Sequence, residues 1–197
     1  MAKSLPGRYA LEQEMEKMDR KEYDAIRTRA LKLYDRAQIV LTPRERENLE
    51  VADMGLGQIE KIGLEVVTYI NTERVCGKEL ALLPGQTCPE HVHPPLGGGN
   101  IGKEETFRCR YGEVYVYVPG DPTPNRKAVP PAGSEEYFTA LHEIILYPGD
   151  EYTLLPNTRH WFQAGPEGAI VSEFSTKSTD ESDVWTDPRI KRIPVIQ

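Results

Sequence analysis

The sequence has few cysteines and no long apolar run. Its three cysteines, Cys76, Cys88 and Cys109, are odd in number and form no Cys-x-x-Cys pair, so neither a disulfide framework nor a thiolate zinc site is indicated. The longest apolar runs, such as 114–118, are far shorter than the ~20 residues of a membrane-spanning helix. The first residues also lack the hydrophobic segment of a signal peptide. We therefore expect a cytoplasmic protein that does not insert into a membrane.

Positive charge is also scarce and is not clustered. The 197 residues include 24 Lys and Arg against 31 Asp and Glu, a formal net charge of -7. An acidic chain without a basic block attracts neither phosphate backbones nor anionic membranes, so we expect neither as a partner. The 39% of hydrophobic residues suffice for a packed core, and the length fits one domain with a modest extension.

The first fifty residues have a helical pattern. Apolar residues recur at steps of three and four between residues 23 and 37, which predicts an amphipathic helix. A weaker helical pattern covers residues 11–18. Thr42, Pro43 and Glu45 supply an N-cap, a proline at the first helical position and an acid three residues after the cap, so they predict a further short helix. We interpret residues 1–52 as an N-terminal helical extension.

Residues 53–197 have the pattern of a β domain. Short runs rich in Val, Tyr, Thr and Leu, separated mostly by Gly, Pro or Asn, favour an antiparallel sandwich or barrel. The stretch 119–134 contains five prolines and is expected to be a long surface excursion. The predicted strands cover residues 64–71, 78–83, 105–111, 113–118, 142–147, 152–155 and 169–174.

Two of the four histidines have the spacing of metal ligands. Residues two apart on a strand point to the same face, so the imidazoles of His91 and His93 can converge on one point. Glu105 shares a strand face with Phe107, and if that face is interior, the buried carboxylate is costly unless a cation or a hydrogen-bond network compensates it. A bound metal would supply that cation. We interpret His142, which stands apart from this pattern, as a structural or surface residue.

The spacing of these residues resembles the first motif of the cupin superfamily. Gly85, five residues, His91-Val-His93, then Glu105, six residues and Gly112 reproduce both outer spacings of that motif. The gap between His93 and Glu105 has eleven residues, where three or four are common. Strand parity and the distance to Gly112 favour Glu105 over Glu104 as the acidic ligand.

A second cupin-like motif lies later in the chain. The stretch from Pro148 to His160 resembles the second motif of the superfamily, although it is one residue shorter and Ala164 stands where Asn is usual. The resemblance implies an all-β cupin (jelly-roll) barrel and a metal site formed by His91, His93, Glu105 and His160. Three imidazoles and one carboxylate suit a divalent first-row metal, so Mn²⁺, Fe²⁺, Co²⁺, Ni²⁺ and Zn²⁺ all remain candidates.

Three longer stretches resemble one cupin family. Residues 78–95, 103–112 and 157–165 are similar to the D-lyxose isomerase family, and the similarity extends from about residue 53 to residue 189. The resemblance implies aldose–ketose isomerisation of a free sugar, D-lyxose to D-xylulose, with D-mannose to D-fructose as a side activity. It also implies Mn²⁺ as the usual metal and a homodimer as the assembly.

Such an isomerase needs groups that move a proton between C1 and C2. Glu173 is our first choice for the base, because it shares a strand face with apolar Ala169 and Val171, and burial among apolar neighbours makes a carboxylate more basic. Lys78 and Lys103 fall at positions that match family motifs, and either ammonium group could orient a sugar hydroxyl or carry a proton.

Three residues are candidates for binding the sugar. Asp183 lies in the polar stretch after the last predicted strand and is a candidate for holding the distal hydroxyls. Phe107 and Trp161 are candidates for lining the pocket, although buried aromatic residues more often belong to the core.

Three other functions are compatible with the same ligands. A sugar-phosphate isomerase would need a phosphate site, which the glycines at 97–99 with Lys103, Arg108 and Arg110 could be argued to form. The two arginines should face away from the ligands, which weakens that alternative. An iron-dependent dioxygenase and a binding module without catalysis are the other two alternatives, because the fold alone does not define the function.

Overall fold

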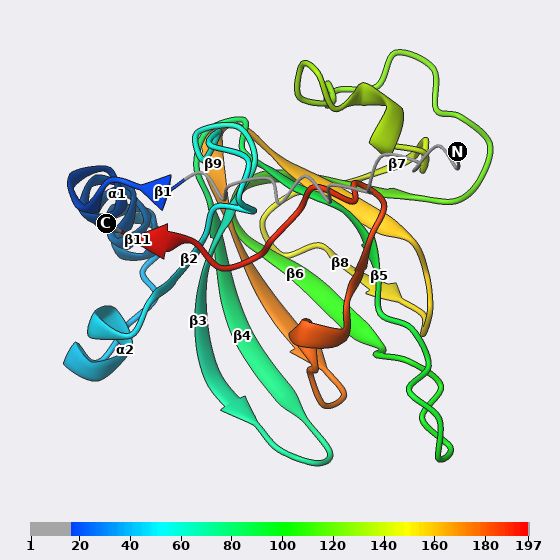
Figure 1. Cartoon of the computed structure of the whole chain (residues 1–197), viewed down its shortest axis with the longest axis horizontal. Coiled ribbons are helices and arrows are strands. Elements are labelled where there is room, and N and C mark those ends of the chain that lie inside the picture. Colours follow the sequence, from blue (N-terminus) through cyan, green and yellow to red (C-terminus); the bar gives the residue numbers. More distant parts are fainter. Residues whose placement is uncertain (1–16, 197) are drawn as a thin grey trace, which may run out of the picture.

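The computed structural model describes residues 17–196, which form a curled antiparallel sheet with a helix packed on its outer face and a separate two-stranded parallel sheet (Figure 1). The expectation of an all-β barrel preceded by helices is confirmed. The helices are α1 (Arg20–Arg36), α2 (Pro43–Glu47) and the 3₁₀ turns η1 (Glu135–Tyr137) and η2 (Asp180–Ser182). The strands are β1 (Lys17–Met18), β2 (Glu50–Ala52), β3 (Leu64–Asn71), β4 (Cys76–Leu82), β5 (Thr87–Val92), β6 (Glu105–Val118), β7 (His142–Leu146), β8 (Glu151–Leu154), β9 (His160–Ser175), β10 (Val184–Trp185) and β11 (Val195–Ile196).

Strands β6 and β9 form the centre of the barrel. They pair along most of their length, and β9 also pairs with β5 near its start and with β4 near its end. On its other edge β6 pairs with β8 and then with β7. A long strand that changes partner along its length bends one sheet into two facing halves, and the apolar side chains between them form the main core.

The motif glycine Gly112 is required where β6 passes a bulge. The register between β6 and β9 shifts on either side of it, and its φ of 69° is unfavourable for residues with a side chain. A Cβ atom at this position would lie 2.0 Å from the carbonyl oxygen of Gly168. The sequence motif therefore marks a close approach of the two central strands.

The two helices predicted for residues 23–37 and after Thr42 are confirmed as α1 and α2. The side chain of Asp19 caps α1, and Thr42 and Glu45 form the expected capping box on α2. The predicted helix over residues 11–18 lies outside the described residues except for Lys17 and Met18, which form β1 and pair with β11. Among the described residues, no helix is long and apolar enough to cross a membrane.

Helix α1 covers the outer face of the sheet. Ile26, Ala30, Leu33 and Tyr34 face β2, β4 and β9 and form a second apolar cluster with residues of these strands. Strand β2, at the end of the predicted extension, pairs with β3 and so continues the barrel sheet. The extension and the barrel thus share a packed core.

Two long segments cover other parts of the barrel (Figure 1). The proline-rich excursion after β6, predicted over 119–134, continues to residue 141 and packs Phe138 and Ala140 against Trp161. The segment after β9 crosses the barrel through η2, pairs with β5 as β10, and continues to β11 beside α1. Predicted strands 105–111 and 113–118 are one strand, β6, because the bulge at Gly112 bends the strand without ending it.

A carboxyl group is buried beneath α1. Glu65 on β3 is fully buried, and Oε1 accepts a hydrogen bond from Gln86 while Oε2 has no hydrogen-bond partner among the described residues. Burial raises the pKa of Glu65 to about 8, while the Gln86 hydrogen bond and the charge of Arg29 oppose the shift and Glu60 adds to it. This carboxyl group is therefore protonated in the folded protein at neutral pH.

We predict that Glu65→Gln stabilises the protein at alkaline pH. Between pH 4.5 and about 8 the folded state keeps a proton that the unfolded state has released, so wild-type stability falls as pH rises through this range. The variant is always neutral, and its gain in unfolding free energy at pH 8 should be on the order of 2–4 kcal/mol. Urea unfolding at pH 5 and pH 8 measures the difference. The exposed Glu167→Gln serves as control, and a gain for Glu65→Gln that does not grow with pH would contradict the prediction.

Candidate active site

Three buried histidines converge inside the barrel. His91 comes from β5, His93 follows the end of β5, and His160 begins β9; one nitrogen atom from each lies within 4.8 Å of the others. The Nδ1 atoms of His91 and His160 contact the carbonyl oxygens of Pro89 (2.8 Å) and Thr158 (2.9 Å). A ring whose Nδ1 donates to such an acceptor keeps its Nε2 lone pair available, as metal ligands require. The sequence prediction that these three residues meet agrees with this geometry.

A bulge in β5 turns His91 toward the interior. Cys88 pairs with Phe162 and His91 pairs with His160, so two residues on β5, Pro89 and Glu90, oppose a single residue on β9. Without the bulge, residues three apart would point to opposite faces. The bulge therefore allows both Cys88 and His91 to line the pocket while Glu90 faces away.

Glu105 lies between the histidines. Its Oε1 atom is 3.2 Å from Nε2 of His93 and 3.0 Å from Nε2 of His160, and its side chain is only 2% exposed. Nε2 of His160 nevertheless makes no hydrogen bond among the described residues. Glu104, the alternative ligand, is exposed because it occupies the opposite parity. The structure thus brings Glu105, and not Glu104, to the histidines.

Charge around Glu105 is balanced by neighbouring groups. Burial favours the neutral acid, but Lys103 and His93 hold the pKa of Glu105 well below its usual value. Burial, with His160 and His93 nearby, lowers the pKa of His91 well below the ordinary value. Burial also opposes protonation of His93, yet Glu105 and Asp183 raise its pKa to about 9. These shifts describe the site without a metal.

The donor set fits a divalent metal. Neutral imidazoles and an ionised carboxylate are the forms that bind such ions, and the lone Nε2 of His160 beside Oε1 of Glu105 is a buried atom in need of a partner. A metal would displace the proton that His93 otherwise holds. The three buried histidines can therefore hold a metal ion.

The ammonium group of Lys103 lies between Glu173 and Glu105. Nζ of Lys103 is 2.7 Å from Oε2 of Glu105 and 2.5 Å from Oε1 of Glu173, and it bridges the two carboxylates. Burial opposes the charge on Lys103, but Glu105 and Glu173 outweigh it and raise the pKa of Lys103 above its ordinary value. Nζ of Lys78 lies 4.0 Å from the same oxygen of Glu173. The expectation of apolar neighbours around Glu173 was incomplete, because two ammonium groups flank it.

The C-terminal segment supplies polar pocket residues that the sequence analysis missed. Asp180 on η2 accepts hydrogen bonds from Nζ of Lys78 at 2.9 and 2.8 Å, and Arg192 lies 3.1 Å from Asp180 and 2.9 Å from Glu50. Lys78 and Arg192, with burial opposing them, hold the pKa of Asp180 below its usual value. The segment after β9 has no periodic pattern, so no sequence signal indicated that it folds back over the barrel.

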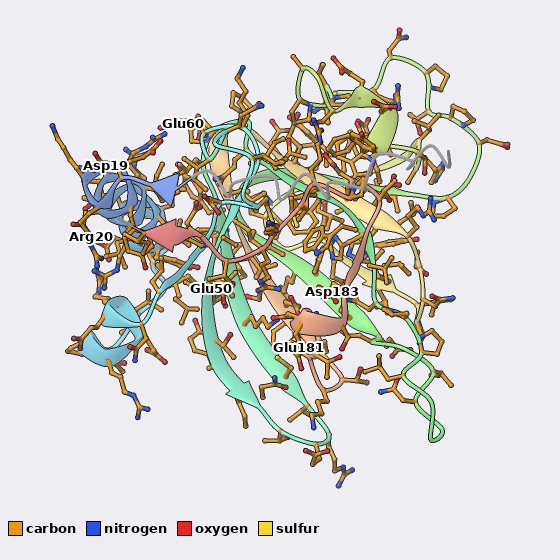
Figure 2. All side chains as sticks on the ribbon, viewed as in Figure 1. Asp19, Arg20, Glu50, Glu60, Glu181 and Asp183 are labelled. Carbon is orange, nitrogen blue, oxygen red and sulfur yellow. The ribbon has the colours of Figure 1, made fainter. Side chains whose placement is uncertain are left out.

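Asp183 reaches a histidine. Its Oδ1 atom lies 2.5 Å from Nδ1 of His93, and its side chain is 4% exposed. Asp183 lines the pocket, as expected of a residue that binds the sugar. Its carboxylate, however, contacts the ring of His93, which is a candidate metal ligand. Figure 2 shows Asp183 on the segment that crosses the barrel.

The aromatic candidates separate into two locations. Phe107 lines the pocket and packs against Phe162. Trp161 lies outside the pocket lining, fully buried and stacked on Tyr117 at a centroid distance of 3.9 Å beneath the excursion. Adjacent residues on a strand face opposite sides, so His160 and Trp161 cannot share the pocket. Trp185 occupies the pocket wall instead, 4.8 Å from the ring of His91.

The pocket has the chemistry of a small-molecule site, because apolar side chains and a few convergent polar groups line it together. Its cavity volume is about 30 Å³. One wall is apolar and the other carries the histidines, carboxylates and ammonium groups. The apolar wall consists mainly of Met54, Leu64, Val66, Leu80, Phe107, Phe162 and Trp185.

Sequence comparison identifies close relatives along nearly the whole chain. A profile of the D-lyxose isomerase family matches residues 37–197. The D-lyxose/D-mannose isomerase of Thermosediminibacter oceani is 58% identical over 183 residues, which cover 93% of this chain and 96% of that protein. The D-lyxose ketol-isomerase of Cohnella laeviribosi is 57% identical over 176 residues, which cover 89% of this chain and 96% of that protein.

Solved structures support the fold independently. The ligand-free L-ribose isomerase of Cellulomonas parahominis superposes with a TM-score of 0.77 at 18% identity, covering 93% of this chain and 100% of that one. The L-ribose isomerase of Acinetobacter sp. DL28 in complex with L-ribose gives 0.75 at 17% identity, covering 92% and 98%. At these identities the similarity shows the fold alone.

The curled sheet with a His and Glu cluster in its interior has the cupin architecture expected from the sequence. The family match and the two relatives show that the protein is an aldose–ketose isomerase. The chain belongs to the D-lyxose isomerase family. The family predicted from the sequence is thereby confirmed.

We predict that the two tryptophans have separable effects. Trp185→Phe removes part of the pocket wall and should raise KM for the sugar with little change in unfolding free energy. Trp161→Phe disrupts the stack on Tyr117 and should lower the unfolding free energy by about 1–3 kcal/mol, with KM unchanged. Steady-state kinetics and urea unfolding of both variants make the comparison. A raised KM in Trp161→Phe alone would contradict our assignment of the pocket wall.

Proposed function

We propose that the protein interconverts D-lyxose and D-xylulose, and also D-mannose and D-fructose, with a divalent metal held by His91, His93, Glu105 and His160. The observation that carries this proposal is the position of Glu173, which lies beside the Glu105 and histidine cluster and is bridged to it by Lys103. A second carboxylate beside the metal site can act as the base that an isomerase needs for proton transfer. A protein that only binds metal has no need of such a base. The names of the two relatives support the choice of sugars.

The reaction moves a proton between C2 and C1 of the sugar through an enediol. A bound divalent metal polarises the carbonyl group and stabilises negative charge that develops on the neighbouring oxygens. Mn²⁺ is our choice of metal on the family resemblance, although Zn²⁺, Co²⁺, Fe²⁺ and Ni²⁺ suit the same donors. The protein groups then have to bind the sugar, exclude water and move the proton.

Glu173 is the proposed base. Its carboxylate faces the pocket from β9, is 4% exposed and lies on the same side of the barrel as the ligands. It accepts the proton from C2 and returns it to C1, while the hydroxyl proton of O2 is transferred to O1, so that the aldose and the ketose contain the same atoms. Lys103 and Lys78 lie 2.5 and 4.0 Å from the Glu173 carboxylate. In the proposed reaction their positive charge stabilises the enediol oxygens as these become negative. The apolar wall with Phe107 keeps water from the reacting centre.

Free sugars are favoured over sugar phosphates. Arg108 and Arg110 lie on the exposed side of β6, opposite Glu105, and Arg110 bonds to Ser172 on that outer side. The glycines at 97–99 lie in an exposed loop. The cations inside the pocket, Lys78, Lys103 and Arg192, already contact carboxylates. A phosphate would therefore meet paired cations rather than a free cationic site.

The proposal includes a homodimer, which rests on the family resemblance. It also includes a cytoplasmic location, which rests on the cysteine-poor composition. Light scattering on the purified protein measures the assembly directly.

We predict metal-dependent ketose formation from the free sugars. Metal-stripped protein is assayed on D-lyxose, D-mannose and their phosphates, with and without Mn²⁺, while oxygen uptake is followed. Conversion of D-lyxose and D-mannose that requires the metal is the expected result. Conversion of the phosphates alone would favour a sugar-phosphate isomerase, oxygen consumption would favour a dioxygenase, and metal binding without any turnover would favour a binding module.

We predict that Glu173→Gln lowers kcat by about 10²- to 10⁴-fold, because the amide keeps the shape but cannot accept the proton. Metal content, measured on the same samples, should stay at the wild-type level. The matched control is Glu104→Gln, an exposed glutamate next to the ligand Glu105. Retention of most of the turnover by Glu173→Gln would show that another group is the base.

A further inference from the structure

The segment from Ser178 to Asp187, here called the strap, contacts β3, β4 and β5 of the barrel and the histidine that follows β5. It follows the last barrel strand and includes η2 and β10, so it lies outside both cupin motifs. In Figures 1 and 2 the strap lies in front of β6 and β9 at η2 and then rises beside β5. Its contacts with the pocket are made by buried or half-buried side chains.

Asp183 contacts the metal-ligand candidate His93 from behind. The carboxylate oxygen lies 2.5 Å from Nδ1, while Nε2 of the same ring faces Glu105 at 3.2 Å. This arrangement holds Nδ1 as the donor and leaves Nε2 as the ligand atom. A carboxylate behind a ligating histidine also makes the imidazole a stronger donor. His91 and His160 have only carbonyl oxygens in this place, so His93 alone depends on a charged partner.

The strap is attached at further points. Trp185 pairs with His91 across β10 and β5, and its ring lies 4.8 Å from that of His91. The backbone N–H of Thr186 donates to the carbonyl oxygen of Glu90, and its hydroxyl donates to the Glu90 side chain. These contacts fix the position of Asp183 along β5, because the strand that carries the first ligand also holds the strap.

Asp180 contacts a different part of the site. Its carboxylate accepts two hydrogen bonds from Nζ of Lys78, and Ser178 contacts the same ammonium group at 2.8 Å. Lys78 in turn is 4.0 Å from Glu173 and, within the described part of the chain, contacts none of the three histidines. One strap therefore positions two groups that serve separate tasks, metal binding and proton transfer.

We propose that Asp183 is a positioning residue for the metal ligand His93, so that metal affinity depends on the strap as well as on the cupin motifs. This inference rests on the metal site of the proposed function. Asp180 is, by the same geometry, a positioning residue for Lys78 that does not contribute to metal affinity. Removal of either aspartate should therefore affect one task and spare the other.

The test is Mn²⁺ titration of metal-stripped protein by calorimetry, combined with kinetics at saturating Mn²⁺. Asp183→Asn should raise the Kd for Mn²⁺ by about 10- to 100-fold, as is usual when a partner of a ligating histidine is removed. Asp183→Ala, which lacks the acceptor altogether, should raise Kd at least as much. Asp180→Asn should leave Kd unchanged while kcat/KM falls. Glu181→Gln, an exposed carboxylate between them, is the matched control and should change neither.

A structural readout accompanies the titration. Asp183 contacts the ligand candidate His93, so metal binding should stabilise the strap. Mn²⁺ should therefore slow amide hydrogen exchange over residues 178–187 in the wild type and in Glu181→Gln. The slowing should be smaller in Asp183→Asn. Thermal unfolding of the metal-free variants identifies any that has lost the fold, and Asp183→Asn and Asp183→Ala then provide two independent measurements.

The outcomes separate the two proposals. A Kd for Asp183→Asn and Asp183→Ala equal to the wild-type value overturns this inference alone. The same holds if Asp180→Asn weakens Mn²⁺ binding as much as Asp183→Asn does, because the effect would then be a general loosening of the strap. Failure of the wild type to bind Mn²⁺ overturns the metal site of the proposed function and this inference with it.

Discussion

The carboxylate of Glu105 is buried in the interior of a barrel, and the rest of the site is arranged around that fact. A buried ionised carboxylate is costly unless opposite charge and hydrogen-bond partners surround it. Lys103 and His93 are those partners, at 2.7 and 3.2 Å. Lys103 is buried as well and needs a second carboxylate, which Glu173 supplies. The proposed base is thus part of the charge balance that allows the proposed ligand to be buried.

The same charge balance extends away from the histidines. Glu173 lies beside Lys78, and Lys78 pairs with Asp180. Asp180 in turn pairs with Arg192, which also contacts Glu50 on β2. Charges of alternating sign therefore connect the centre of the barrel with the C-terminal segment and with the strand that follows the N-terminal helices. Removing one of these charged groups leaves its neighbours unpaired in a buried site, so mutations here are expected to be non-additive.

The architecture explains how a sheet can present this site. The bulge in β5 turns both Cys88 and His91 inward, and the bulge at Gly112 lets the two central strands approach closely. The strap then covers the pocket from outside the barrel, and Trp185 completes its wall. The outer face under α1 carries its own buried acid, Glu65, which belongs to the packing of the helix and not to the pocket.

Local rules in the sequence were sufficient for much of this. Strand parity placed Glu105 and Phe107 inside and Glu104, Arg108 and Arg110 outside, because side chains alternate along a strand whatever surrounds it. The caps of α2 and the helical period of α1 are likewise properties of a few neighbouring residues. The cupin spacing located the histidines, because a motif records which residues face the same point.

Only the tertiary structure decided which distant segments meet. The sequence gives no periodic signal after β9, so the return of the strap, the contact of Asp183 with His93, and the roles of Asp180, Trp185 and Arg192 in the pocket could not be predicted. The choice of Trp161 over Trp185 shows the same limit: parity assigns a face to a residue but does not tell which segment covers that face. Contacts of this kind depend on where the chain returns in space, which is fixed by packing and charge pairing across the whole barrel.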